Sequence, residues 1–554
     1  MSRRIARAAV AVLVGAALAV TGLSGPASPA QAAPELPPVY KTVSKTYKMT
    51  MRDGIVLTAL VVVPKGVTGK QPLVLIPSAW GGEKGQMQVA AGVLAKRGMI
   101  AINYATRGFK ESQGQVELAG PNDIHDVSDL IDWAGKNVNA DTNKVGMFGL
   151  SYGAGLSLLA SAYEPRLKAV GSLEGFSDLP RTATPNGTRA TVLIAGLWFG
   201  AVIAGKLSPE LKTGFQALLT GKEPKGTEIA DALASLKTRS PLFMTDAINK
   251  NHPAVYLATS WNDIAYGTDQ MTEFYNKLTV PKRLEIRPGD HVINEVPGAI
   301  GVGPATVEYD HLYDWMQTYL MGQPTSVTTA PPVWIKPRSS GAKPANETYP
   351  NLAAMTTGTQ TLTLTAPTGL VQPTGGMTTG AATSWTTTLK AGGDVAGGLG
   401  APIAGFAQEA LTGRPPSDLL WATDRSKAAL WVGPKQASPL VLRGDTTVSF
   451  TIVPSATRGT LVAYLYDSDA GAPGGTGYLI SHRPYTFKNV KAGQPLRISF
   501  PLQPTAYNVP AGHRLAVGLS TGDPVYASEN PKGSTIRLVS SAATPLTVTS
   551  QLGK

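Results

Sequence analysis

The chain has no cysteine among its 554 residues, and only 16% of them are charged. The absence of cysteine excludes disulfides, so core burial alone must stabilise the protein. Three nucleic-acid signatures are missing as well: Lys/Arg runs interleaved with aromatics, Cys/His finger spacing and a recognition-helix pattern. We therefore expect no nucleic-acid partner. With 43% apolar residues the composition is that of an ordinary globular protein, and the length predicts roughly two or three domains.

The first 32 residues are organised like a secretory signal peptide. A basic start with Arg3, Arg4 and Arg7 is followed by the apolar "AAVAVLVGAALAVTGL" and by a small-x-small cleavage site at residues 30–32. The apolar run is short for a membrane span, which disfavours a retained anchor. We expect a secreted, bacterial exported protein with no stable membrane span in its mature form. Its net charge of +12 would allow loose association with an anionic cell wall.

The first half of the mature chain alternates between strand and helix patterns. "TYKMTMRDGIVLTALVVVP" alternates on both sides of Asp53-Gly54, which predicts a hairpin. Short apolar runs such as "PLVLIPSAW", "MIAINYATRG" and "LKAVGSLEG" are then separated by helical patterns such as "QMQVAAGVLAKRG" and "DIHDVSDLIDWAGKNV". This order predicts an α/β domain with a parallel sheet covered on both faces.

The stretch "GLSYG" at residues 149–153 places a serine between two glycines, where a predicted strand ends and a predicted helix begins. This is the context in which the G-x-S-x-G motif forms a nucleophile turn. The turn is so tight that small residues must flank it, and it exposes the serine hydroxyl above the sheet. The N–H of Tyr152 would lie at a helix N-terminus and could stabilise an oxyanion. Ser151 is therefore the predicted nucleophile, and the alternative is an incidental serine in a glycine-rich turn.

A nucleophilic serine needs a base and an acid that orients the base. In α/β-hydrolases these follow the serine in the order acid, then histidine. The apolar run "PAVYLATSWND" ends at Asp263, and "KRLEIRPGDH" ends at His291. Both residues come just past predicted strands, on the same sheet edge as Ser151, where such sheets build their sites. We predict Asp263 as the acid and His291 as the base.

Other candidates for the acid and the base are few. Two further aspartates are available, but Asp290 is adjacent to His291 and would not reach its far nitrogen, which leaves Asp269 as the other alternative acid. The remaining histidines lie on predicted helices, before a strand or in a later all-β region, and are better explained as structural or solvated: His125, His252, His311, His482 and His513.

Several stretches beyond the serine motif are shared with one group of serine hydrolases. They include "ATRGFKESQGQ", "DLIDWAGKN", "SWND", "PGDH" and, near the C-terminus, "LVLRGDTTVSFTIVPSATRGTLVAYLYDSD" and "PTAYNVPAGHRLAVGLS". On these stretches most of the mature chain resembles the CocE/NonD family, the cocaine esterase-like and X-Pro dipeptidyl-peptidase-like serine hydrolases. The resemblance implies a nucleophile at Ser151, an acid at Asp263, a base at His291 and a first oxyanion donor in the N–H of Tyr152.

One position close to the chemistry departs from the family pattern. The family usually has a tyrosine on the loop after the first inner strand, and its hydroxyl is the second oxyanion donor. Here the loop reads "PSAWGG", with Trp80 at that place. We expect Trp80 to supply the second donor, from its backbone N–H in preference to its indole N–H. The alternative is that Trp80 only lines the pocket.

Two changes in pattern predict the remaining architecture. Helical patterns over residues 177–252 interrupt the strand–helix alternation, and an insertion there would cap the active site. From about residue 323 the chain is rich in Thr, Gly and Pro with short alternating strands. We predict an α/β-hydrolase core over 33–322 with a helical cap, followed by an all-β jelly-roll domain over 323–554. The resemblance favours a bracing role for that domain over carbohydrate binding.

We expect neither a metal nor a cofactor. "DSDAGAPGG" at residues 467–475 begins like a calcium loop, but Tyr478 stands where the twelfth-position glutamate should be. A serine hydrolase that works through an acyl-enzyme also needs no cofactor. The segment is therefore interpreted as a turn.

The predicted function is hydrolysis of carboxylic esters by a secreted serine esterase, with a small-molecule ester or a peptide as substrate. The first alternative is an Xaa-Pro dipeptidyl-peptidase of the same fold, which needs a carboxylate to hold the substrate's free amine. Glu174, Asp178 and Glu83 are candidates for that carboxylate. The second alternative is a catalytically inactive secreted protein that binds the cell wall or carbohydrate.

Overall fold

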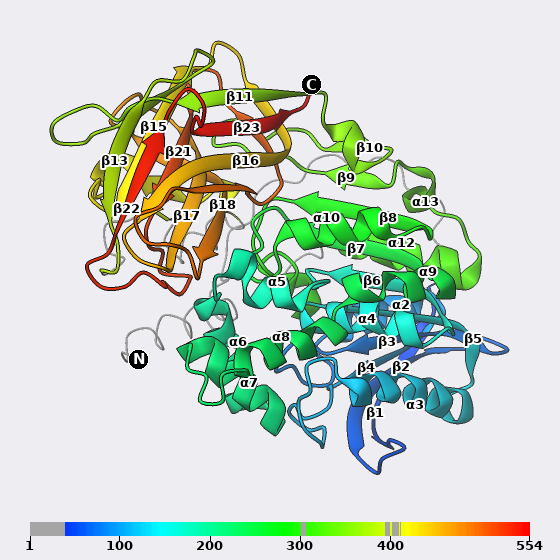
Figure 1. Ribbon diagram of the computed structural model, residues 1–554. Helices are drawn as coiled ribbons and strands as arrows, with labels where there is room; N and C mark the ends of the chain where they lie inside the picture. The colour runs from blue at the N-terminus through cyan, green and yellow to red at the C-terminus, as the bar shows by residue number, and fades with distance from the viewer. Residues whose placement is uncertain (1–38, 301–305, 394–398, 401–408, 410–411) are drawn as a thin grey trace.

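The computed structural model describes residues 39–300, 306–393, 399–400, 409 and 412–554. The predicted signal peptide lies outside these residues. Figure 1 shows a mixed helix-and-sheet layer formed by the first half of the chain, and beside it an all-β domain formed by the second half. This arrangement confirms the predicted fold class of an α/β core with helices inserted and a C-terminal all-β domain.

A single sheet organises the first domain. Its strand order is β1-β2-β4-β3-β5-β6-β7-β8-β9-β10. All pairings from β4 through β3 and on to β9 are parallel, whereas the β1–β2, β2–β4 and β9–β10 pairings are antiparallel. Their bounds are β1 Lys41–Thr50, β2 Val56–Lys65, β3 Gln71–Pro77, β4 Ile100–Tyr104, β5 Ala140–Leu150, β6 Leu167–Leu173, β7 Ala254–Ser260, β8 Lys282–Arg287, β9 Val333–Ile335 and β10 Glu347–Tyr349.

Both faces of this sheet are buried, as the near-continuous apolar strands predict. In β3, Leu73 and Leu75 belong to one core cluster while Val74 and Ile76 belong to another. Because successive side chains of a strand point to opposite faces, each strand must be apolar throughout. Helices α3 (Pro121–Asn137), α4 (Tyr152–Tyr163) and α10 (Thr268–Lys277) cover the first face, and α2 (Gln88–Lys96) and α12 (Val307–Met321) cover the second.

The segment between β6 and β7 is built from helices, where the cap was expected. They are α5 Leu179–Ala183, the 3-10 turn η2 Pro185–Gly187, α6 Thr191–Ala204, α7 Pro209–Thr220, α8 Glu228–Thr238, the 3-10 turn η3 Pro241–Met244 and α9 Thr245–Asn251. In Figure 1, α6, α7 and α8 lie together beside the sheet domain. The apolar helix α6 packs into this group, and among the described residues we find no helix with the length and apolarity needed to cross a membrane.

Two short strands and two short helices lie after β8 in the chain. Strands β9 and β10 extend the first sheet beyond the predicted boundary at residue 322, and α11 (Val296–Ile300) and α13 (Ser326–Thr329) flank α12. The exact boundaries of the core, the cap and the second domain remain predictions.

The 13 strands of the second domain form one largely antiparallel sheet by their hydrogen bonds, and this sheet folds into two layers around a shared apolar core. Val448 and Phe450 of one layer and Leu461 and Val517 of the other belong to one buried cluster. Whether the strands follow jelly-roll connectivity remains a prediction. The strands are β11 Gly358–Leu364, β12 Gly375–Thr378, β13 Trp385–Lys390, β14 Ser417–Leu419, β15 Ala428–Lys435, β16 Leu440–Pro454, β17 Gly459–Ser468, β18 Thr476–Phe487, β19 Leu496–Pro501, β20 Thr505–Val509, β21 Arg514–Ser520, β22 Thr535–Ser540 and β23 Thr547–Leu552, with short 3-10 turns η4 Leu352–Met355 and η5 Leu420–Ala422.

Candidate active site

Ser151 occupies a strained turn between β5 and α4. Its backbone has φ 56° and ψ −115°, a combination that is costly for a residue with a side chain. Close approach explains the flanking glycines. A Cβ on Gly149 would lie 2.4 Å from the carbonyl carbon of Gly153, and a Cβ on Gly153 would lie 2.5 Å from the carbonyl oxygen of Pro77. The small residues therefore permit the turn, and the turn presents the serine at the carboxyl edge of the sheet.

The structure brings Ser151, His291 and Asp263 into one hydrogen-bonded chain. The Ser151 Oγ lies 2.8 Å from the Nε2 of His291, and the Nδ1 of His291 lies 2.9 Å from the Oδ2 of Asp263. The three residues follow β5, β8 and β7, whose carboxyl ends meet at one sheet edge. Histidine stands in the middle, so one ring nitrogen faces the hydroxyl and the other faces the carboxylate. This is the geometry in which imidazole can take a proton from serine.

Backbone groups hold the Asp263 carboxylate in place. Its Oδ1 accepts hydrogen bonds from the N–H of Ala265 at 2.8 Å and of Tyr266 at 2.7 Å. Asp290, the neighbouring alternative acid, makes different contacts, since its Oδ1 accepts from the N–H of Ile264 at 2.8 Å and of His291 at 2.6 Å. Asp290 thus ties the acid's loop to the histidine's loop.

The other sequence candidates lie away from this chain. Asp269 forms ion pairs with Arg181 and Arg483. His252 is the C-cap of α9, and three further histidines have partners of their own: His311 with Glu285, His482 with Tyr526 and His513 with Asp467. His125 lies within α3.

The His291 ring is enclosed, which affects its protonation. Burial lowers the pKa of His291, and the nearby carboxyl groups of Glu174 and Asp290 only partly oppose this effect. The ring of Tyr266 packs edge-on against the imidazole, with centroids 4.9 Å apart and planes at 88°. A neutral imidazole near neutral pH follows, and this is the form that can accept a proton.

Two backbone N–H groups near the nucleophile turn remain available as donors. Tyr152 begins α4, and Trp80 lies in the loop after β3; in the described part of the chain neither backbone N–H donates to another residue. The indole N–H of Trp80 is already used, because it donates to the carbonyl oxygen of Leu197 in α6 at 2.9 Å. The Trp80 ring packs against the Tyr152 ring at 5.3 Å. If Trp80 supplies a second oxyanion donor, the backbone N–H is the group that remains for it.

An apolar cavity of about 420 Å³ lies within the cap. Its wall includes Leu193 and Leu197 of α6 and Phe215 of α7, and the Phe215 ring is 6.4 Å from the Trp80 ring. Charged residues also line it, but Glu228 accepts from backbone N–H groups and Glu210 pairs with Arg239. The cavity therefore offers mainly hydrocarbon surface. The Trp80 ring lies between its wall residue Phe215 and Tyr152 of the nucleophile turn.

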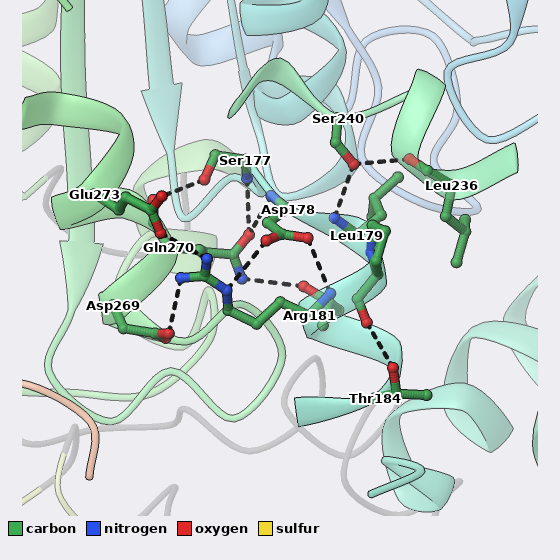
Figure 2. A network of polar contacts seen from close by, with 12 residues as sticks. Ser177, Asp178, Leu179, Arg181, Thr184, Leu236, Ser240, Asp269, Gln270 and Glu273 are labelled. Carbon is green, nitrogen blue, oxygen red and sulfur yellow. Dashed lines mark hydrogen bonds and ion pairs between the residues drawn. The ribbon is translucent and has the colours of Figure 1, made fainter. Parts of the chain in front are cut away.

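The root of the cap is fastened to the helix that follows the Asp263 loop. Figure 2 shows Arg181 of α5 among carboxylates, with ion pairs to Asp178, Asp269 and Glu273 at 3.1, 3.0 and 2.6 Å. Arg483 of β18 reaches the same Asp269 at 2.6 Å. One aspartate of α10 thus joins the cap, the core and the C-terminal domain, an arrangement that braces the loop carrying the acid.

Glu174, Asp263 and His291 bring three possible ligand atoms within 4.8 Å of one another. Both ring nitrogens of His291 already face Ser151 and Asp263, so a cation here would have to break the hydrogen-bonded chain. The donor set does not fit a resident metal without that loss.

Two residues contribute to the site in ways that the sequence candidates do not include. Tyr266 is absent from those candidates, although its place three residues after Asp263 is a signal for it. Glu174 is a candidate only as an amine-binding group, whereas its carboxyl is fully buried beside Asp263. Its place directly after β6, at the same sheet edge as the other strand-end residues, is the feature that could indicate this contact.

Comparisons with known proteins identify two family domains in the chain. The model of the X-Pro dipeptidyl-peptidase (S15 family) matches residues 53–293, and that of the X-Pro dipeptidyl-peptidase C-terminal non-catalytic domain matches residues 325–551. An uncharacterized 31.7 kDa protein of Escherichia coli is 30% identical over 130 residues, which are 23% of this chain and 44% of that protein. The chain thus spans less than half the length of that curated relative.

Solved structures share the fold over nearly the whole chain. An aminopeptidase from a marine sediment Thaumarchaeota archaeon has a TM-score of 0.67 at 16% identity, covering 96% of this chain and 99% of its own. A CocE/NonD family hydrolase from Staphylococcus aureus has a TM-score of 0.67 at 13% identity, covering 92% and 93%. An α-amino acid ester hydrolase has a TM-score of 0.63 at 18% identity, covering 95% and 98%. Because the S15 family model and the model of its C-terminal domain together match most of the chain in order, the chain belongs to the X-Pro dipeptidyl-peptidase S15 family.

Proposed function

We propose that the protein is a serine hydrolase that cleaves carboxylic esters through an acyl-enzyme on Ser151. The observation that carries this proposal is the chain of hydrogen bonds from Ser151 through His291 to Asp263. The serine oxygen attacks the ester carbonyl while its proton passes to the Nε2 of His291. The imidazolium then protonates the leaving alcohol, and a water activated by the same nitrogen releases the acid. Asp263 keeps the Nδ1 proton in place throughout.

The oxyanion of each tetrahedral intermediate is stabilised by two main-chain donors in this proposal. The N–H groups of Tyr152 and Trp80 have no other acceptor among the described residues. Donors that are fixed before the reaction begins stabilise developing charge without reorganisation. The family's tyrosine hydroxyl is thus replaced by a backbone group.

Ester cleavage is favoured over Xaa-Pro peptidase activity by the places of the candidate amine-binding carboxylates. Glu174 is fully buried and accepts from Ser260. Asp178 caps α5 and pairs with Arg181. Glu83 is exposed in the loop after β3. None of the three lines the cap cavity, which is the substrate pocket in this proposal. The Xaa-Pro dipeptidyl-peptidase remains the second candidate because the S15 family model covers the site.

The cap cavity sets the expected substrate class. Its hydrocarbon lining and its volume of about 420 Å³ suit an apolar acyl or alcohol group. We therefore propose a hydrophobic ester as substrate. The basic, apolar and small-residue pattern of residues 1–32 further supports the proposal that the enzyme acts outside a bacterial cell.

The test is a panel of p-nitrophenyl esters from acetate to decanoate beside Xaa-Pro p-nitroanilides. We expect ester turnover that rises with chain length and no release from the anilides above the S151A background. Turnover of Xaa-Pro anilides with no ester activity would reject the ester assignment in favour of the peptidase.

A pair of cap variants links chain length to the cavity. Ala183 lines it, so Ala183→Leu should lower kcat/KM for decanoate at least about tenfold and leave acetate unchanged, since about three methylenes of burial would be lost. Ala234 is exposed on α8 and does not line the cavity, which makes Ala234→Leu the matched control. An equal loss on both esters would show that the cavity does not bind the substrate chain.

A further inference from the structure

A second carboxyl group lies directly behind the acid of the proposed triad. Glu174 follows β6 and has φ 52°, a left-handed conformation that is unfavourable for glutamate. Its N–H donates to the carbonyl oxygen of Ala258 in β7 at 2.8 Å, which fixes this conformation. The side chain is fully buried. A strained backbone that holds an ionisable group in the interior is typical of residues with a role in a functional site.

The contacts of Glu174 point it at the active-site chain. Ser260 donates its hydroxyl to the Oε1 at 2.7 Å and its N–H to the Oε2 at 3.2 Å. One carboxyl oxygen of Glu174, one of Asp263 and a ring nitrogen of His291 all lie within 4.8 Å of one another. Two carboxyl groups that share a hydrogen bond need a proton between them.

The surroundings decide which carboxyl carries the proton. Asp263 accepts two backbone N–H groups and faces the Nδ1 of His291, so its charge is well solvated by donors. Glu174 is paired with Arg287, whose Nη2 is 3.7 Å from the Oε1. That guanidinium also contacts Glu295 and lies 3.3 Å from Glu308, so its charge is divided among three carboxylates.

The pKa directions agree with this distribution. Burial raises the pKa of Glu174, the negative charge of Asp263 raises it further, and Arg287 opposes these effects. Burial also raises the pKa of Asp263, but the hydrogen bonds from Glu174 and from the N–H groups of Tyr266 and Ala265 lower it. The other titratable groups near this place are His291, which lies within 4.8 Å of both carboxyl groups, Asp290, which accepts from the N–H of Ile264 and His291, and Tyr266, whose ring packs on His291.

We propose that Glu174 is a neutral carboxylic acid that donates a hydrogen bond to Asp263 and thereby positions that carboxylate against His291. Glu174 acts through Asp263 and touches no reacting atom, so it is a positioning residue. The inference rests on the proposed function, because it concerns the orientation of His291 during ester cleavage. Ionisation of Glu174 at alkaline pH removes the donor and places a second negative charge behind Asp263, so activity should fall there.

Two substitutions at Glu174 separate the hydrogen bond from the ionisation. In Glu174→Gln the amide N–H₂ still donates to Asp263 and its oxygen still accepts from Ser260, but the group cannot ionise. In Glu174→Leu the donor is gone. Glu164 is a buried glutamate at the far end of α4, bonded to Ser128 and Arg166, so Glu164→Gln is the matched control.

The measurement is kcat and KM for an ester substrate from pH 5 to 10.5, with thermal unfolding of every variant. E174L should lose about 10- to 100-fold in kcat with unchanged KM, as expected when a hydrogen bond to a charged group is lost. E174Q should restore most of that activity at pH 7 and should lack the alkaline decline of the wild type. E164Q should keep the wild-type profile.

Three results would overturn the inference. One is an alkaline decline in E174Q identical to that of the wild type. Another is an E174Q that loses as much activity as a folded E174L, since the carboxylate charge would then be what matters. The third is a folded E174L with wild-type activity. If E174L does not fold, the E174Q profile decides alone. Failure of the proposed function would look different, because the wild type itself would then show no Ser151-dependent ester turnover.

Discussion

Two clusters of serine, histidine and aspartate lie among the residues that the structure describes, and they differ in which residue stands in the middle. At the edge of the first sheet, His291 lies between Ser151 and Asp263. In the C-terminal domain, Asp467 lies between Ser340 and His513: its Oδ2 accepts from the Ser340 hydroxyl, and its Oδ1 lies 2.8 Å from the Nδ1 of His513.

The order of contacts, more than the composition, determines what each cluster can do. A serine bonded to imidazole can lose its proton to a base whose pKa lies near neutrality. A serine bonded to a carboxylate only satisfies that carboxylate, which Tyr507 also does at 2.9 Å. The backbone differs as well, because Ser151 has a positive φ and Ser340 does not. We expect the cluster around His291 to be catalytic and the cluster around Asp467 to be structural.

The largest expected contrast is between alanine substitutions of the two serines. Ser151→Ala should lower kcat by about 10⁴-fold or more and leave unfolding unchanged. Ser340→Ala should leave kcat within about twofold and lower the free energy of unfolding by about 1.5–3 kcal/mol, since a hydrogen bond to a charged group is lost. Kinetics and chemical denaturation of both variants measure this. Ester activity of S151A within tenfold of the wild type would remove the distinction.

The two histidines extend the same contrast. His291→Ala should reduce kcat nearly as far as Ser151→Ala, and the double variant should be little worse than either single one, because the residues act as a unit. His513→Ala should leave turnover essentially unchanged. Steady-state kinetics of the four proteins are sufficient. If the fold-losses in kcat of S151A and H291A multiplied in the double variant, Ser151 and His291 would not act as one unit.

The pH dependence should report the buried histidine of the first cluster. Since burial lowers the pKa of His291, kcat/KM should fall on the acid side through an ionisation below the ordinary histidine value of about 6.5. The sign follows from the base being neutral: activity is present above this pKa and lost as pH falls through it. An acid limb with an apparent pKa above the ordinary histidine value of about 6.5 would argue against the buried His291 as the base.

The smallest expected effect concerns Trp80. A substitution there distinguishes its indole N–H from its backbone N–H as the oxyanion donor near Ser151. Trp80→Phe removes the indole N–H but keeps an aromatic ring and the backbone N–H. Because the indole donates to Leu197, kcat should change by less than about tenfold, and the lost hydrogen bond should cost about 0.5–1.5 kcal/mol of stability. A fall of about 10²- to 10³-fold in kcat with unchanged KM and unfolding would make the indole the oxyanion donor.

Local and periodic features of the sequence are enough to predict the fold. They also predict that Ser151, Asp263 and His291 lie at one edge of the first sheet. The glycines around Ser151 are required by close approach of the chain, so the motif and the turn are one feature. Asp263 and His291 can be predicted because carboxyl ends of parallel strands meet at the same edge. Their catalytic roles stay predictions until they are measured.

Contacts across the sequence cannot be predicted in the same way. The acceptor of the Trp80 indole is 117 residues away in the cap, and the partner of Glu174 lies on another strand end. The pairing of β9 and β10 with the first sheet likewise depends on a sheet edge left open by β8. Such contacts are set by tertiary packing, for which a single sequence carries no periodic signal.

The cluster with histidine in the middle should activate its serine, and the cluster with aspartate in the middle should not. The direct measurement is to incubate the purified protein with a fluorophosphonate and to map the modified peptide by mass spectrometry. We expect one label per chain, on Ser151, and no label in S151A. Absence of labelling in the wild type, or a label on Ser340, would contradict this distinction.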